Sequence, residues 1–166
     1  IRLSLVGSEM CIRDRVTDRD YPGAAFAVVN RDQILHISTF GHTNAARTQK
    51  IDTETTFRLA SVSKTFAAEI VGLLVDDGTL NWHDPVTLYV PDFKINGDAS
   101  KIQIRHLLGQ STGLMHHAYD NLLEHGKSME TIWQRMSDLS YLCQPGKCYG
   151  YQNSVFSLVD PVVEKA

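Results

Sequence analysis

A helical pattern that opens with a serine and a lysine is the feature that most constrains how this chain can fold. Over residues 61–77 the apolar side chains recur at the i, i+3 and i+4 spacing of a helix, and Gly78 stands where a glycine commonly ends one. Lys64 follows Ser61 by three positions, which is about one turn of helix on the same face. The pattern therefore predicts a mostly buried helix that holds a hydroxyl and an amine side by side at its start.

Such a pair can make a serine nucleophilic without a histidine. A neutral Lys64 can take the proton of Ser61, and the helix N-terminus offers N–H groups to an oxyanion and, together with burial, disfavours the lysine cation. Taken alone, the pair is more commonly a helix-capping serine followed by a solvated lysine, because short motifs often match by chance. The surrounding sequence has to decide between the two readings.

Two later segments carry polar residues in places where a site could form. Residues 104–114 form a short apolar helical stretch that breaks into a polar, glycine-containing loop. Residues 144–153 contain a Pro-Gly turn and then the triplet Tyr151-Gln152-Asn153, followed by another apolar run. A tyrosine or an asparagine from this triplet could complete the serine and lysine pair.

With these segments the chain resembles the serine beta-lactamase and penicillin-binding-protein superfamily, in particular class C beta-lactamases and the related esterases and D-peptidases. The resemblance runs from about Tyr21 to Ala166, and several landmarks in the family's order make it more specific than any one of them. They are FRLASVSKTF at 57–66, LYVPDF at 88–93, RHLLGQSTGL at 105–114 and YQN at 151–153.

The resemblance implies an α+β fold in which an antiparallel sheet flanked by helices adjoins a mostly helical region. The family's third motif, a Lys-Thr-Gly or His-x-Gly triplet on a strand, is not found before Ala166. We therefore expect the fold to be truncated at its C-terminus, and the activity of the chain by itself to be weak or absent.

The resemblance also implies a role for each site residue. Ser61 would be the acylated nucleophile, Lys64 and Tyr151 would share the general-base and general-acid work, and Asn153 would hydrogen-bond the substrate. The expected activity is that of a serine hydrolase that forms an acyl-enzyme with a beta-lactam, a D-amino peptide or a small ester. The alternative is a homologue of penicillin-binding proteins that binds such molecules without catalysis.

A second Tyr-x-Asn triplet, Tyr119-Asp120-Asn121, competes for the tyrosine role. Tyr151 is preferred because a Pro-Gly turn precedes it and a helical run follows it, which gives the rigid support that a base requires. Tyr119 follows a glycine loop and adjoins Asp120, so we expect it on a mobile rim.

Cys143 and Cys148 flank a four-residue turn. Either the turn closes a small disulfide, which fits an oxidising compartment such as the periplasm, or the two thiols stay unpaired. A periplasmic or secreted location is also what the resemblance implies.

The composition argues against several other classes of function. With 16 Lys and Arg against 19 Asp and Glu the net charge is −3, no basic patch suggests nucleic acid, and no apolar run is long enough for a membrane span. The histidines lack a metal-binding spacing, and His116-His117 is expected at a loop rim. We expect no metal and no cofactor, a small-molecule or peptide substrate, and an oligomeric state that the sequence leaves open.

Residues 1–15 are expected to lie outside the natural domain. Their stretch LVGSEMCIRDR, at 5–15, reads like a translated transposon-based sequencing adapter. The hydrolase domain is therefore expected to span residues 16–166. Its first elements should be a β-hairpin over 23–30 and 34–41, and a later amphipathic helix is expected over 128–139.

Overall fold

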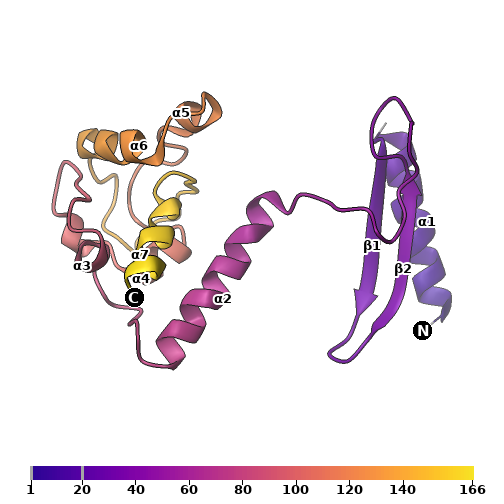
Figure 1. The fold of residues 1–166 in the computed structure, drawn as a ribbon, viewed down its shortest axis with the longest axis horizontal. Coiled ribbons are helices and arrows are strands. Elements are labelled where there is room, and N and C mark those ends of the chain that lie inside the picture. Colours follow the sequence, from indigo (N-terminus) through magenta and orange to yellow (C-terminus); the bar gives the residue numbers. More distant parts are fainter. Residues whose placement is uncertain (1, 20) are drawn as a thin grey trace. The chain divides into compact units, whose positions relative to one another are not determined.

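The computed structural model describes residues 2–19 and 21–166, which divide into two units, one ending at Arg58 and the other running from Leu59 to Ala166 (Figure 1). The first unit contains the helix α1 (Arg2–Asp18) and the antiparallel strands β1 (Gly23–Val29) and β2 (Ile34–Gly41). The predicted hairpin is confirmed. Its turn is closed by Asn30, whose side-chain oxygen accepts hydrogen bonds from the backbone N–H groups of two residues further along the turn.

The two strands meet closely at the end away from this turn. Gly23 pairs with Gly41, which has a φ of 72°, and His42 donates a backbone hydrogen bond to the Pro22 carbonyl. A Cβ atom on Gly41 would lie 2.2 Å from the Pro22 oxygen, so this crossing requires glycine.

Helix α1 covers most of the segment that the sequence places outside the domain. It lies along β2 (Figure 1), and the guanidinium carbon of Arg13 is 5.4 Å from the ring centroid of Phe40. A helix there does not bear on the origin of the segment, and the boundary at residue 15 stays a prediction.

The second unit is built from helices. A 3-10 turn, Ala60–Val62, leads into α2 (Ser63–Asp76). The helices that follow are α3 (Val86–Tyr89), α4 (Ile104–Leu108), α5 (Asp120–Glu124), α6 (Met129–Arg135) and α7 (Val159–Lys165), with 3-10 turns at Ala99–Lys101, Met136–Asp138 and Phe156–Leu158. The predicted helix over 128–139 is found as α6 and the turn after it, with the Ser128 side chain capping its first turn.

The core of this unit lies among α3, α4, α6 and α7, and one side of α2 packs against it. Its most completely buried apolar residues come from all five of these helices and from the turns and loops between them. They are Val71, Val86, Ile102, Ile104, Leu107, Ile132, Met136, Val155, Leu158 and Val162.

Helix α2 ends where the sequence indicates but is less buried than predicted. Gly78 has a φ of 83° and donates its N–H to the Val75 carbonyl, which closes the helix. Only Val71 of α2 is buried, whereas Phe66 and Leu73 are exposed. The prediction of a mostly buried helix was wrong, because the core of residues 59–166 covers only one side of α2.

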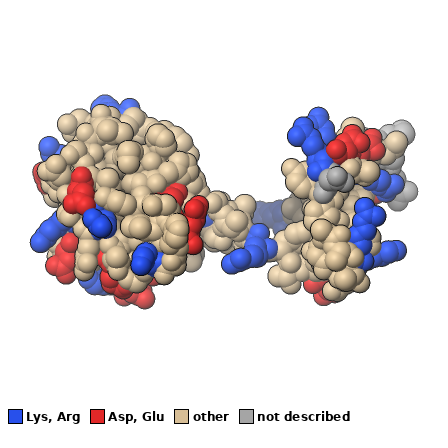
Figure 2. All heavy atoms as spheres, turned by 90° about the horizontal axis from the view of Figure 1, so that it is seen from above, with Lys and Arg blue, Asp and Glu red and all other residues tan. Residues whose placement is uncertain are grey.

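Charged side chains of both signs are interspersed on the face of the 59–166 unit that Figure 2 shows. The exposed side chains of Arg135 and Asp138, also in this unit, form an ion pair at 3.7 Å. Among the described residues, none of the helices combines the length and the apolar content needed to cross a bilayer.

Candidate active site

Ser61 lies in the 3-10 turn just before α2, and its side chain is exposed. Ala60, the residue before it, has a φ of 47°, in the left-handed region that residues with a Cβ rarely adopt. This bend brings the chain sharply into the helix. Lys64, in the first turn of α2, places its Nζ 3.5 Å from the Ser61 Oγ.

Tyr151 lies against this pair. Its hydroxyl is 2.6 Å from the Ser61 Oγ, and the Lys64 Nζ is 5.0 Å from its ring centroid. The nearby Lys64 ammonium and then the Ser61 hydroxyl lower the pKa of Tyr151, because both favour the phenolate; burial and the Asp120 charge oppose them. Lys64 and Ser61 therefore make the Tyr151 hydroxyl more acidic, which favours the phenolate form that could act as a base.

The position of Tyr151 and Asn153 is fixed by the residue between them. Gln152 is buried, its backbone N–H donates to the Gln110 Oε1 at 2.8 Å, and its own Oε1 accepts from the Thr112 hydroxyl at 2.9 Å. With Gln152 anchored in this way, both of its neighbours contact the pair at the start of α2, Tyr151 through Ser61 and Asn153 through Lys64. The 105–114 motif therefore supports the Tyr-x-Asn triplet.

Backbone contacts hold the same two segments together. His117 donates its N–H to the Tyr151 carbonyl at 2.8 Å, and Gly150 donates to the Gln110 carbonyl at 2.8 Å. The site is therefore carried by the loop after α4 as much as by α2.

The turn before Tyr151 is closed by a disulfide between Cys143 and Cys148. Gly146, inside this turn, donates its N–H to the Ser111 carbonyl at 2.7 Å. The neighbouring Gly113 has a φ of 82°, and a Cβ there would lie 2.3 Å from the Cys143 carbonyl oxygen. The disulfide loop and the 111–113 segment are thus packed backbone against backbone.

Asn153 joins Lys64 to a carboxylate. Its Oδ1 accepts from the Lys64 Nζ at 2.8 Å, while its Nδ2 donates to the Asp120 Oδ2 at 3.1 Å. The same Asp120 oxygen lies 2.8 Å from the His117 Nδ1, and the His117 ring centroid is 5.6 Å from that of Tyr151. The four residues named from the sequence are brought together, and Asp120 and His117 join them.

Sequence reasoning missed Asp120 and His117. Both lie in features that the sequence does show, the competing triplet and the His116-His117 pair, but neither has a spacing that ties it to Ser61. Only the fold brings them to Asn153 and Tyr151.

Tyr119 is not on a mobile rim. It is partly buried and packs against the hydrophobic core, and it precedes α5 with a φ of 60°. Among the described residues its hydroxyl has no hydrogen bond to Ser61 or Lys64, because its ring is used in packing. That prediction about Tyr119 was wrong, whereas the preference for Tyr151 agrees with the geometry.

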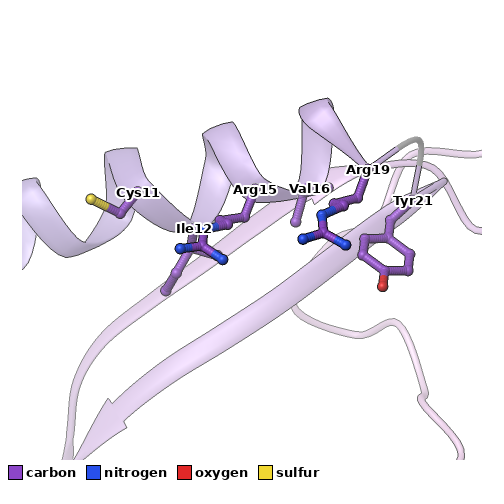
Figure 3. A pocket seen from close by; sticks show the side chains of 6 residues that line it. All are labelled: Cys11, Ile12, Arg15, Val16, Arg19 and Tyr21. Atoms are coloured by element: carbon purple, nitrogen blue, oxygen red, sulfur yellow. The ribbon is translucent and has the colours of Figure 1, made fainter.

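A cavity elsewhere in the described residues lacks the groups of a catalytic site. A hollow of about 360 Å³ beside α1 is lined by Cys11, Ile12, Arg15, Val16, Arg19 and Tyr21 (Figure 3). It has no carboxylate or imidazole to act as a base for Cys11. In the part of the chain that the structure describes, no three His, Cys, Asp or Glu side chains are grouped to hold a metal ion.

Comparison with known proteins gives consistent results. Residues 9–166 match the family model described as Beta-lactamase. Penicillin-binding protein 4* of Bacillus subtilis (strain 168) is 30% identical over 152 residues, which cover 88% of this chain and 33% of that protein. The chain spans about a third of the length of the curated relatives it matches.

Solved structures share the fold. The octameric penicillin-binding protein homologue from Pyrococcus abyssi superimposes with a TM-score of 0.82 at 25% identity, over 96% of this chain and 39% of that one. A class C beta-lactamase in complex with cefoxitin gives a TM-score of 0.81 at 19% identity, over 98% of this chain and 45% of that one. At that identity the likeness shows the fold alone, and it confirms the α+β architecture of a sheet with flanking helices, of which this chain covers part.

Proposed function

Since this chain belongs to the beta-lactamase family, a family of hydrolases, we propose that it carries the acylation centre of a serine hydrolase that works through an acyl-enzyme. The observation that carries the proposal is the contact of the Ser61 Oγ with the Tyr151 hydroxyl at 2.6 Å, beside the Lys64 ammonium. A nucleophile, a base and a cation that tunes the base are all within reach of one carbonyl group.

In the proposed acylation, the Tyr151 phenolate takes the proton of Ser61 while the Ser61 oxygen attacks the substrate carbonyl. A C–O bond forms, and the electron pair of the carbonyl moves onto its oxygen. When the tetrahedral intermediate collapses, the bond to the leaving group breaks and Tyr151 returns its proton to that group. Water then attacks the ester on Ser61, which releases the acid and restores the hydroxyl.

Lys64 and Asn153 prepare this step. The ammonium of Lys64 lowers the pKa of Tyr151, so a larger share of the phenolate is present near neutral pH. Asn153 holds that ammonium through its side-chain oxygen at 2.8 Å, and one N–H of its Nδ2 donates to Asp120. We propose that the second N–H of this amide donates to the substrate.

The substrate is proposed to be a beta-lactam, a D-amino peptide or a small ester. All three present a carbonyl with a leaving group, which is what the mechanism above requires. The family membership supports this range but no single member of it. We further propose a periplasmic or secreted location, which the Cys143–Cys148 disulfide favours because disulfides persist in oxidising compartments.

Covalent labelling tests the nucleophile. A fluorescent acyl phosphonate or penicillin probe is expected to label the chain and its Ser63→Ala variant, and to leave Ser61→Ala unlabelled. Labelling needs a single turnover, so it detects acylation even where hydrolysis is slow.

Two outcomes would count against the proposal. An unlabelled wild-type chain, or equal labelling of Ser61→Ala, would remove Ser61 as the nucleophile. Unlabelled protein that still binds the penicillin reversibly would instead favour the non-catalytic homologue.

A further inference from the structure

A carboxylate lies one hydrogen bond behind the proposed acylation centre. The Asp120 Oδ2 accepts from the Asn153 Nδ2 at 3.1 Å and lies 2.8 Å from the His117 Nδ1. Its other oxygen is buried and has no hydrogen-bond partner among the described residues. The bonds to Asn153 and His117 are therefore the side-chain contacts that hold the carboxylate.

The carboxylate determines how the Asn153 amide is turned. An ionised carboxylate can only accept hydrogen bonds, so Asn153 presents its NH₂ group to Asp120. Its carbonyl oxygen then faces the other way, where the Lys64 Nζ donates to it at 2.8 Å. If the amide were reversed, its NH₂ group would face the Lys64 ammonium, donor against donor. Its oxygen would face the Asp120 carboxylate, acceptor against acceptor, and both hydrogen bonds would be lost.

The backbone around Asp120 is held in an uncommon conformation. His117 and Tyr119 have φ values of 54° and 60°, which are unfavourable for residues with a Cβ. The turn between them is fastened to the site, because His117 donates its N–H to the Tyr151 carbonyl at 2.8 Å. Asp120 therefore follows a strained segment of backbone that is hydrogen-bonded to Tyr151.

We propose that Asp120 is a positioning residue, which fixes the Asn153 amide and through it keeps the Lys64 ammonium beside Ser61 and Tyr151. The inference rests on the proposed function for its consequence in catalysis, but its structural content can be tested without turnover. Asp120 does not touch Ser61 or Tyr151 by any hydrogen bond among the described residues.

The titration of Tyr151 distinguishes positioning from a simple charge effect, because the two have opposite signs. Lys64 lowers the pKa of Tyr151, whereas the negative charge of Asp120 raises it. If Asp120 acted only through its charge, removing it would lower the pKa of Tyr151. If Asp120 holds Lys64 in place, removing it releases the ammonium and the pKa of Tyr151 rises.

The experiment is a ¹³C NMR titration of the chain labelled at tyrosine Cζ, with the Tyr151 signal assigned from Tyr151→Phe. Asp120→Ala is expected to move the Tyr151 midpoint upward by about 1 pH unit, the scale of shift that a nearby opposite charge produces. Asp120→Glu, which keeps the acceptor, is expected to restore much of the wild-type value. Asp138→Ala, which removes an exposed carboxylate paired with Arg135, is the matched control and should change nothing.

A double-mutant cycle identifies the route. In an Asn153→Ala background, Asp120→Ala should no longer raise the midpoint, since the amide that connects Asp120 to Lys64 is gone. Circular dichroism of each variant checks folding; if Asp120→Ala does not fold, Asp120→Leu, which also lacks an acceptor for the Asn153 amide and is closer to Asp in shape, replaces it and the sign of its shift decides.

A downward shift or no shift in the folded Asp120 variant would overturn the proposal, and so would an equal upward shift in the Asn153→Ala background. Failure of the proposed function is recognised by a different experiment, the covalent probe, which would then leave Ser61 unlabelled. The Tyr151 titration does not depend on acylation, so it tests the role of Asp120 whether or not Ser61 is labelled.

Discussion

Tyr151 and Ser61 are 90 positions apart in the chain, yet their hydroxyl oxygens are 2.6 Å apart in the fold. Tyr119, which begins a second Tyr-x-Asn triplet, instead packs its ring against the hydrophobic core. The two tyrosines differ in their surroundings, because the residue after Tyr151, Gln152, is buried and hydrogen-bonded to Gln110, which fixes the backbone beside Tyr151.

Phenylalanine at each tyrosine should separate them. Tyr151→Phe removes the proposed base and is expected to slow labelling of Ser61 by roughly 10²- to 10⁴-fold, the usual contribution of general acid–base catalysis. Tyr119→Phe keeps the packed ring and should label at nearly the wild-type rate. Labelling rates of the two variants, measured side by side, check this; a larger loss at Tyr119 would reverse the assignment.

The lowered pKa of Tyr151 has a pH consequence. The base is the phenolate, so the labelling rate should rise with pH and level off above the pKa of Tyr151, with a midpoint below the ordinary value of 10.0. Lys64→Met removes the main cause of the lowering, so the midpoint should move upward toward that value. The exposed Lys101→Met is the control. An unchanged midpoint in Lys64→Met would show that Tyr151 is not the titrating base.

At the scale of elements, the turn before α2 is the strained part of the site. The sequence pattern predicts the helix and its start, but the left-handed conformation of Ala60, at φ 47°, is not visible in the pattern. Ser61 follows this residue directly and precedes α2, so the strain lies next to the proposed nucleophile.

Glycine should therefore be better than alanine at position 60 and worse inside the helix. Ala60→Gly is expected to raise the free energy of unfolding by up to about 1 kcal/mol, or to leave it unchanged, since glycine adopts positive φ without a steric cost. Ala68→Gly, in the middle of α2, should destabilise by about 0.5–1 kcal/mol. Urea unfolding gives both free energies, and a destabilising Ala60→Gly of similar size would contradict the strain at this turn.

At the scale of the whole molecule, every side chain of the candidate site belongs to residues 59–166. The contacts that position Tyr151, Asn153 and Asp120 also lie within this unit. The same unit leaves apolar residues of α2 such as Phe66 and Leu73 exposed. The site is therefore formed within one unit, and that unit leaves apolar surface of α2 exposed.

The separate unit should keep the site. Residues 59–166 expressed alone are expected to show the same Tyr151 midpoint as the whole chain, because the groups that set it are all present. Leu73→Gln, at a side chain that is 70% exposed, should reduce aggregation of this unit without moving that midpoint. Light scattering and the tyrosine titration measure the two effects; a lost or shifted Tyr151 signal would show that residues before Leu59 are required.

Local patterns were enough to predict the hairpin, the extent of α2, the helix after Ser128 and the pairing of Ser61 with Lys64. Each of these depends on residues a few positions apart, whose geometry follows from helix periodicity or turn chemistry. The choice of the tyrosine was supported by its flanking sequence, and the fold adds the reason, the buried Gln152.

Only the tertiary structure decided that Asp120 and His117 join Asn153, that Tyr119 packs inward and that α2 has one exposed side. These depend on which loops meet after the chain has closed over long separations, and on which side chains the core has room to bury. The sequence by itself determined that Ser61 and Lys64, three positions apart, lie close together, since local spacing dictates that contact, with Ser61 in the 3-10 turn and Lys64 in the first turn of α2. The surroundings that turn the pair into a site come from packing, which no local pattern encodes.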